Sequence, residues 1–211
     1  LSLAWIGDSL PAQERQQTLA KFGAATIAGM ILGQVLGGVF VDTIGWRAAF
    51  ALTALVFLVA GVRLLRFARS NPPVLADNPS SNVVAGYLAL LSNRWMRFVI
   101  IIVGIEGACA MGAVAFLPTR LHLHFGLPLW LAGLVVAMHG IGGLLFAWRS
   151  RWLINYLGVI GMARIGASAL GLGLCSIVWL PHWMLVLPAC ALMGFGFSML
   201  HNTLQNLATQ A

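Results

Sequence analysis

Residues Phe22–Val41 read FGAATIAGMILGQVLGGVFV, a stretch without Asp, Glu, Lys or Arg. An α-helix rises about 1.5 Å per residue, so about 20 apolar residues cross the hydrocarbon core of a bilayer. A helix also bonds its backbone polar groups internally, as a lipid environment requires. The stretch therefore predicts a transmembrane helix.

Five further apolar stretches follow along the chain. The first of them is short, but Arg47 and Arg63 at its ends can extend their charged groups toward the interface. Pro181 interrupts the long uncharged run that ends the sequence and divides it into two spans. We expect an all-α, polytopic transmembrane helix bundle with six full spans, of which these five are residues 48–62, 98–119, 127–148, 165–180 and a last span that starts near 183.

The composition excludes several classes of protein. Of 211 residues, 60% are hydrophobic and 8% are charged, whereas a soluble domain carries about 25% charged residues. So few charges cannot cover the surface of a soluble enzyme, and a disordered chain needs low hydrophobicity. The basic residues behind the net charge of +7 are scattered, so no nucleic-acid partner is expected. Metal-ligand spacings, a P-loop and a dinucleotide fingerprint are missing, so we expect no enzyme activity, metal or cofactor.

The positions of the basic residues predict an orientation. If the six spans alternate in direction, all but two of the 12 Lys and Arg residues lie on one side of the membrane. The exceptions are Arg47 and Arg120. Positively charged residues favour cytoplasmic loops. We therefore expect residues 1–21, 63–97 and 149–164 to be cytoplasmic, in a chain embedded in the lipid bilayer.

One polar segment predicts a domain boundary. Residues 70–82 read SNPPVLADNPSSN, and this content of Pro, Ser and Asn is typical of a linker. The short apolar piece after it, residues 83–91, could lie along the membrane interface. We expect three parts: residues 1–69 as the end of one bundle, 70–92 as a central linker with a short interfacial helix, and 93–211 as four spans of a second bundle.

Three patterns follow one another near the start of the chain. They are Asp8-x-x-Pro11-x-x-x-Arg15, then Gly29-x-x-x-Gly33-Gln34-x-x-Gly37-Gly38, then Gly45-Trp46-Arg47-x-x-Phe50. Small residues four apart lie on one helix face and let another backbone approach closely. Together with the run HNTLQ at residues 201–205, the patterns resemble the major facilitator superfamily of secondary transporters. More narrowly, they resemble the twelve-helix drug:proton antiporters of the bacterial efflux-permease branch.

The resemblance implies that the chain runs from the end of helix four to helix ten, so that the missing helices of the same polypeptide would be its partners. It implies a multi-pass protein of the bacterial inner membrane that exports a small-molecule substrate in exchange for protons by alternating access. Asp8, Pro11 and Arg15 would form a cytoplasmic loop motif, and the glycines would form the antiporter motif of helix five. Two alternatives stay open: a proton-coupled transporter of a metabolite such as a sugar derivative, and a polytopic scaffold that transports nothing.

Two titratable residues fall at the middle of predicted spans. An ionised carboxylate at the depth of Glu106 costs several kcal/mol or more unless it is paired or hydrated. We predict that Glu106 couples proton movement to transport; the alternative is a permanently protonated acid bonded to a neighbouring helix. His139 is a second candidate for proton coupling, with a packed and satisfied side chain as its alternative.

The last span carries a polar stripe. Ser198, Asn202 and Gln205 follow helical spacing and lie on one face. Polar groups at membrane depth must face protein or water. We therefore expect this stripe to line a substrate cavity, together with Glu106 on a second cavity-lining helix that the resemblance implies. Gln34 is a further candidate for the cavity, with an interhelical hydrogen bond as its alternative.

Overall fold

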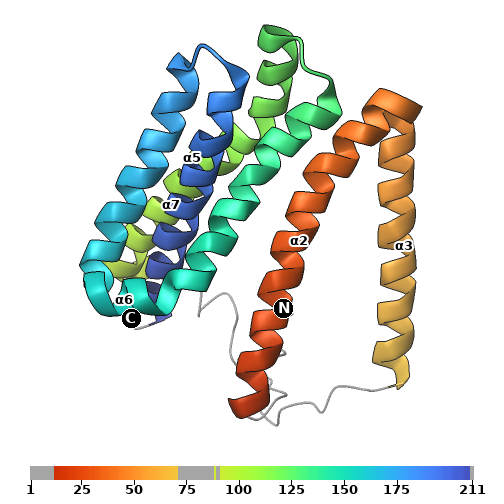
Figure 1. The fold of residues 1–211 in the computed structure, drawn as a ribbon. Helices are drawn as coiled ribbons and strands as arrows, with labels where there is room; N and C mark the ends of the chain where they lie inside the picture. The colour runs from red at the N-terminus through yellow and green to blue at the C-terminus, as the bar shows by residue number, and fades with distance from the viewer. Residues whose placement is uncertain (1–11, 71–87, 89–90, 210–211) are drawn as a thin grey trace.

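The computed structural model describes residues 12–70, 88 and 91–209, and this part of the chain folds into helices. The long helices are α2 (Ala12–Ile44), α3 (Trp46–Ser70), α5 (Arg94–Phe125), α6 (Leu129–Trp179) and α7 (Trp183–Thr209). Figure 1 shows α5, α6 and α7 clustered together, with α2 between this cluster and α3. All five are long and apolar enough to cross a membrane, which confirms the predicted all-α transmembrane class.

The start of α2 differs from the prediction. α2 begins at Ala12, well before Phe22, so the expected loop over residues 1–21 is wrong for residues 12–21. The sequence there, AQERQQTLAK, consists mainly of strong helix formers that extend the apolar helix. Of the predicted loop motif, Arg15 lies within α2, while Asp8 and Pro11 lie outside the described residues. Most of segment 70–92, with its predicted linker and interfacial helix, also lies outside them.

The count of six separate spans is not matched, because the described residues hold five helices of sufficient length. The difference lies in α6, which has 51 residues and joins two predicted spans through the expected loop at 149–164. That segment contains no proline, so its residues continue the helix up to a break at Gly158, where φ is 63° and ψ is 178°. This conformation is essentially restricted to glycine. α6 therefore consists of two helical segments that turn back on each other at Gly158 (Figure 1).

Close packing between α6 and α7 holds the cluster together. A Cβ atom at Gly142 would meet the backbone oxygen of Ala191, and one at Gly194 would meet the backbone oxygen of His139. Small residues allow such approaches, and the resulting van der Waals attraction replaces a hydrophobic driving force that lipid does not supply. Buried apolar side chains of α5, α6 and α7 form the core around these glycines: Ala110, Leu121, Ala132, Val135, Val136, Val186, Cys190 and Met193.

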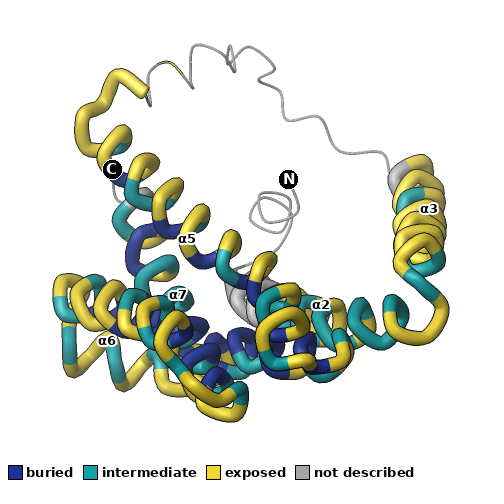
Figure 2. Tube along the Cα trace, turned by 90° about the horizontal axis from the view of Figure 1, so that it is seen from above, coloured by how far each residue is buried: buried dark blue, intermediate teal, exposed yellow. Residues whose placement is uncertain are grey.

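α3 lies apart from this core, as Figure 2 shows. Gly45, with φ of 84°, makes the turn between α2 and α3. Among the described residues α3 packs against α2 alone, and α2 packs in turn against α6. The α2–α3 hairpin is therefore connected to the three-helix cluster through the contact between α2 and α6.

Candidate functional site

A cavity of about 620 Å³ lies between α2, the first segment of α6 and α7. Its wall on α7 is polar, because Ser198, His201, Asn202 and Gln205 recur every three or four residues and so share one helix face. The wall on α2 is mainly apolar and includes Phe22. Asp, Glu, Lys and Arg are absent from the described residues that line the cavity.

The structure brings together four of the residues that the sequence singled out. His139 of α6 and the predicted stripe of Ser198, Asn202 and Gln205 all line this one cavity. Gln34 does not line it. Gln34 and His139 instead border a gap of about 10 Å³ between α2 and α6, which is about the size of one water molecule.

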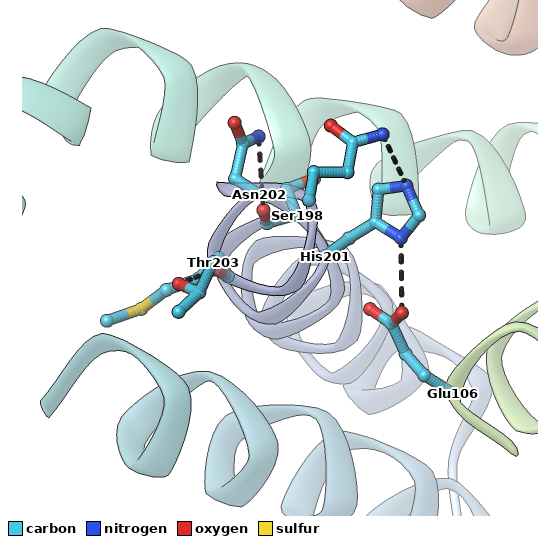
Figure 3. Close-up of polar contacts among 7 residues, drawn as sticks. Glu106, Ser198, His201, Asn202 and Thr203 are labelled. Carbon is cyan, nitrogen blue, oxygen red and sulfur yellow. Dashed lines mark hydrogen bonds and ion pairs between the residues drawn. The ribbon is translucent and has the colours of Figure 1, made fainter. Parts of the chain in front are cut away.

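Glu106 lies on α5 and is absent from the lining of the cavity. Figure 3 shows its carboxyl group bonded to His201. Its side chain is 2% exposed, and its Oε2 lies 3.1 Å from Nδ1 of His201. Its other oxygen, Oε1, has no hydrogen-bond partner among the described residues. Glu106 is therefore absent from the described lining of the cavity, whereas its partner His201 belongs to it.

His201 is the residue of the site that sequence reasoning missed. Its Nε2 lies 3.0 Å from Nε2 of Gln205, and the ring of Phe197 stacks on its face with centroids 5.2 Å apart. Phe197 also contacts the ring of His139, at 5.7 Å. The signal was present, because His201 precedes Gln205 by one helical turn and therefore belongs to the same polar stripe.

His139 differs from His201 in its contacts. It is buried, and its Nδ1 has no hydrogen-bond partner among the described residues. The ring is therefore packed without a described partner for Nδ1, and the role of His139 in proton coupling stays a prediction. The carboxyl group of Glu106 bonds the imidazole of His201, so the structure favours His201 over His139 as the partner of the buried acid.

The cavity continues toward the break at Gly158. A second hollow, of about 450 Å³, is bordered by Ile154 and Val159 on the two sides of that break. Asn202 and Gln205 border both hollows, so the polar face of α7 leads from one to the other. We call this end of the helix cluster the Gly158 end.

At the opposite end, which we call the Asp42 end, α2 and α6 are joined by direct contact. Oδ2 of Asp42 on α2 accepts a hydrogen bond from the backbone N–H of Trp130, at 2.8 Å. This N–H belongs to the first turn of α6, whose N-cap residue, Pro128, offers no side-chain hydrogen bond. A carboxylate at a helix N-terminus satisfies a free donor and interacts favourably with the helix dipole. Asp42 therefore joins the α2–α3 hairpin to the three-helix cluster at this end.

Glycines also bring α2 and α6 together. A Cβ atom at Gly38 would meet the backbone of Leu129, and one at Gly133 would meet the backbone oxygen of Gln34. For Gly29, Gly33 and Gly37, a Cβ atom would meet no described atom within 4 Å. Within the described residues, the close approach of α2 to another backbone therefore falls at Gly38.

Asp42→Ala is expected to loosen the Asp42 end. Loss of an N-cap acceptor costs about 1 kcal/mol, which corresponds to roughly a fivefold larger population of the opened end. Val41 borders a hollow beside Gly38 and Leu129 at this end. Labelling of Val41→Cys by a membrane-impermeant maleimide should therefore accelerate in the Asp42→Ala background. Asp42→Asn, which keeps a capping oxygen, is the control, and equal labelling in all backgrounds would contradict the contact's role.

Comparison with known proteins assigns the class of this chain. The family model of the Major Facilitator Superfamily matches residues 1–211. The chain therefore belongs to the major facilitator superfamily, and it is a multi-pass membrane protein of a family of secondary transporters rather than of enzymes. No curated protein and no solved structure matches it.

Proposed function

We propose that this protein is a proton-coupled exporter of small molecules, an antiporter of the bacterial inner membrane that works by alternating access. The observation that carries the proposal is the position of Glu106. Its carboxyl group is buried inside a membrane-spanning helix cluster, bonded to a histidine that faces a cavity between the two halves of the molecule. The superfamily membership supports transport, and the buried acid supports proton coupling.

The free energy of the Glu106 carboxyl group differs between dry and water-filled surroundings. In the dry state, one oxygen of Glu106 has no partner among the described residues, and burial of a charge without a full set of partners is costly. Access of water to the group removes this cost. A conformational change that wets and dries the site therefore binds and releases a proton, and so couples the proton gradient to the transport cycle.

The cavity supports a small molecule as the substrate. Its volume, about 620 Å³, lies within the range of about 300–1,000 Å³ that is typical of sites for small ligands. Apolar side chains on α2 face amide, hydroxyl and imidazole groups on α7. Such a lining suits an amphipathic compound with a few hydrogen-bonding groups.

The orientation and the number of crossings belong to the same proposal. We propose that the two segments of α6 cross the membrane separately, which restores six crossings. Arg149, Arg151 and Arg164 flank the break at Gly158, and basic residues favour the cytoplasm. The Gly158 end would then be cytoplasmic, with the hollow there leading to the cavity and the contact of Asp42 closing the outer end.

Reconstituted vesicles provide the test. The full-length protein is placed in liposomes with an imposed pH gradient, and the flux of a panel of dyes, drugs and sugar derivatives is measured. We expect gradient-driven flux of amphipathic compounds that a protonophore abolishes. Gradient-driven flux of the sugar derivatives alone would favour the metabolite transporter. If the flux of every compound is independent of the pH gradient, the proposal is contradicted.

A further inference from the structure

We infer that His201 carries the proton between the cavity and Glu106, and that the amide of Gln205 turns to match the protonation state of His201. This inference rests on the proposed proton coupling. Glu106 is 2% exposed and does not line the cavity, whereas the side chain of His201 is 33% exposed and does. Among the described residues, the imidazole is the polar group that reaches both.

The hydrogen-bond partners of His201 indicate the starting state of the proposed proton transfer. The Nε2 atom of Gln205 is a donor and cannot accept, so its contact with Nε2 of His201 requires an unprotonated ring nitrogen there. A neutral imidazole then carries its hydrogen on Nδ1. Nδ1–H donates to Oε2 of Glu106, at 3.1 Å. When Glu106 is ionised, this arrangement places Oε2 where it can accept the proton of Nδ1.

Transfer of one proton follows from these positions. A proton delivered by cavity water bonds to Nε2 of His201 and makes the ring an imidazolium. The Nδ1–H bond then breaks, and its proton bonds to Oε2 of Glu106. The ring is left neutral with its hydrogen on Nε2, and Nδ1 accepts a hydrogen bond from the new carboxylic acid. The net change is one proton moved from the cavity to Glu106, and the reverse sequence releases it.

Gln205 is suited to follow this change. Once Nε2 of His201 carries a hydrogen, the NH₂ group of Gln205 would place donor against donor. Rotation of the amide by about 180° presents its oxygen, which accepts from Nε2–H. Phe197 stacks on the imidazole at 19° between planes, so the ring stays aligned with both partners while the amide moves.

Among the described residues that line the cavity, no charged side chain competes with Glu106 for the proton on His201. On α7 the neighbours of His201 in the cavity are uncharged, and on α2 the lining residues, such as Phe22 and Thr26, are uncharged as well. On α6 the titratable residue in the cavity lining is His139, which touches Phe197. Glu106 on α5 is therefore the acid that the proton on His201 can reach.

The test separates coupling from transport itself. Two fluxes are measured in vesicles for a compound that the wild type moves: flux driven by a pH gradient, and exchange of labelled for unlabelled compound at equal pH, which needs no net proton movement. For His201→Gln we expect the driven flux to fall at least about tenfold, since a lost proton-transfer group costs about 10²–10⁴ in rate. Exchange should fall by less than the driven flux. His124→Gln, an exposed histidine of α5, is the matched control and should keep both fluxes.

The outcomes distinguish this inference from the proposed function. A wild type without driven flux contradicts the proposed function. A wild type with driven flux that His201→Gln retains overturns the relay, and so does loss of coupling in His139→Gln with normal coupling in His201→Gln. If His201→Gln fails to fold, Gln205→Met decides: it keeps the size of the side chain but neither donates nor accepts an amide hydrogen bond, so driven flux at the wild-type rate would overturn the relay.

Discussion

Glu106→Gln is expected to abolish flux driven by a pH gradient while the protein still folds and reaches the membrane. Glutamine has the size of a protonated glutamic acid and cannot lose a proton, so it holds the site in its neutral form. It also removes the desolvation cost of the buried acid, whose Oε1 has no partner among the described residues. We expect a reduction in driven flux of at least about 100-fold, the scale of a lost acid–base group.

The measurement for Glu106→Gln is the initial rate of gradient-driven flux in vesicles that contain equal amounts of folded protein. Glu106→Asp is the matched control, because it keeps a titratable carboxyl but lengthens the 3.1 Å contact to His201. We expect Glu106→Asp to keep a measurable part of the driven flux. Driven flux at the wild-type rate in Glu106→Gln would show that the coupling proton binds elsewhere.

Gly194→Val is expected to cause the largest loss of stability in the helix cluster. A Cβ atom at Gly194 would meet the backbone of His139, with the carbonyl carbon only 2.6 Å away. Backbone cannot move aside as a flexible side chain does, so α6 and α7 must separate. Overpacking of this kind costs about 3 kcal/mol, or roughly 6–12 °C in melting temperature for a chain of this size.

Thermal melting in detergent, followed by size-exclusion chromatography, checks this expectation. Gly171→Val is the matched control on α6, because a Cβ atom there would meet nothing within 4 Å. That variant should melt close to the wild type or slightly above it, since valine has a higher helix propensity than glycine. Equal melting temperatures for the two variants would contradict the close packing of α6 and α7.

The features that the sequence predicts are those that depend on the local composition of the chain. Long uncharged stretches identify the helices, because burial of backbone groups in lipid leaves few other structures. Glu106 stands out by the cost of its charge at membrane depth, and the stripe on α7 by its helical spacing. These arguments are local in sequence. Four of the residues that they selected line the cavity.

The features that the sequence could not predict depend on which helix faces pack against each other. The bond between Glu106 and His201 joins residues 95 positions apart, and no spacing rule relates them. The glycine repeat shows which face of α2 carries small residues, but not which of the glycines another backbone approaches. That contact falls at Gly38. The arrangement of α6 was missed because a single glycine with an unusual conformation, Gly158, separates its two helical segments in place of the expected loop.

The exposure of α3 has a practical consequence. Phe50 and Phe57 are 72% and 73% exposed, and no residue of α3 with a described side chain is buried. Such a surface is unstable in water and must be covered by acyl chains or by other protein. During purification the amphiphile therefore acts as a structural component of the α2–α3 hairpin, and a micelle too thin to coat α3 along its length should release this hairpin before it disrupts the three-helix cluster.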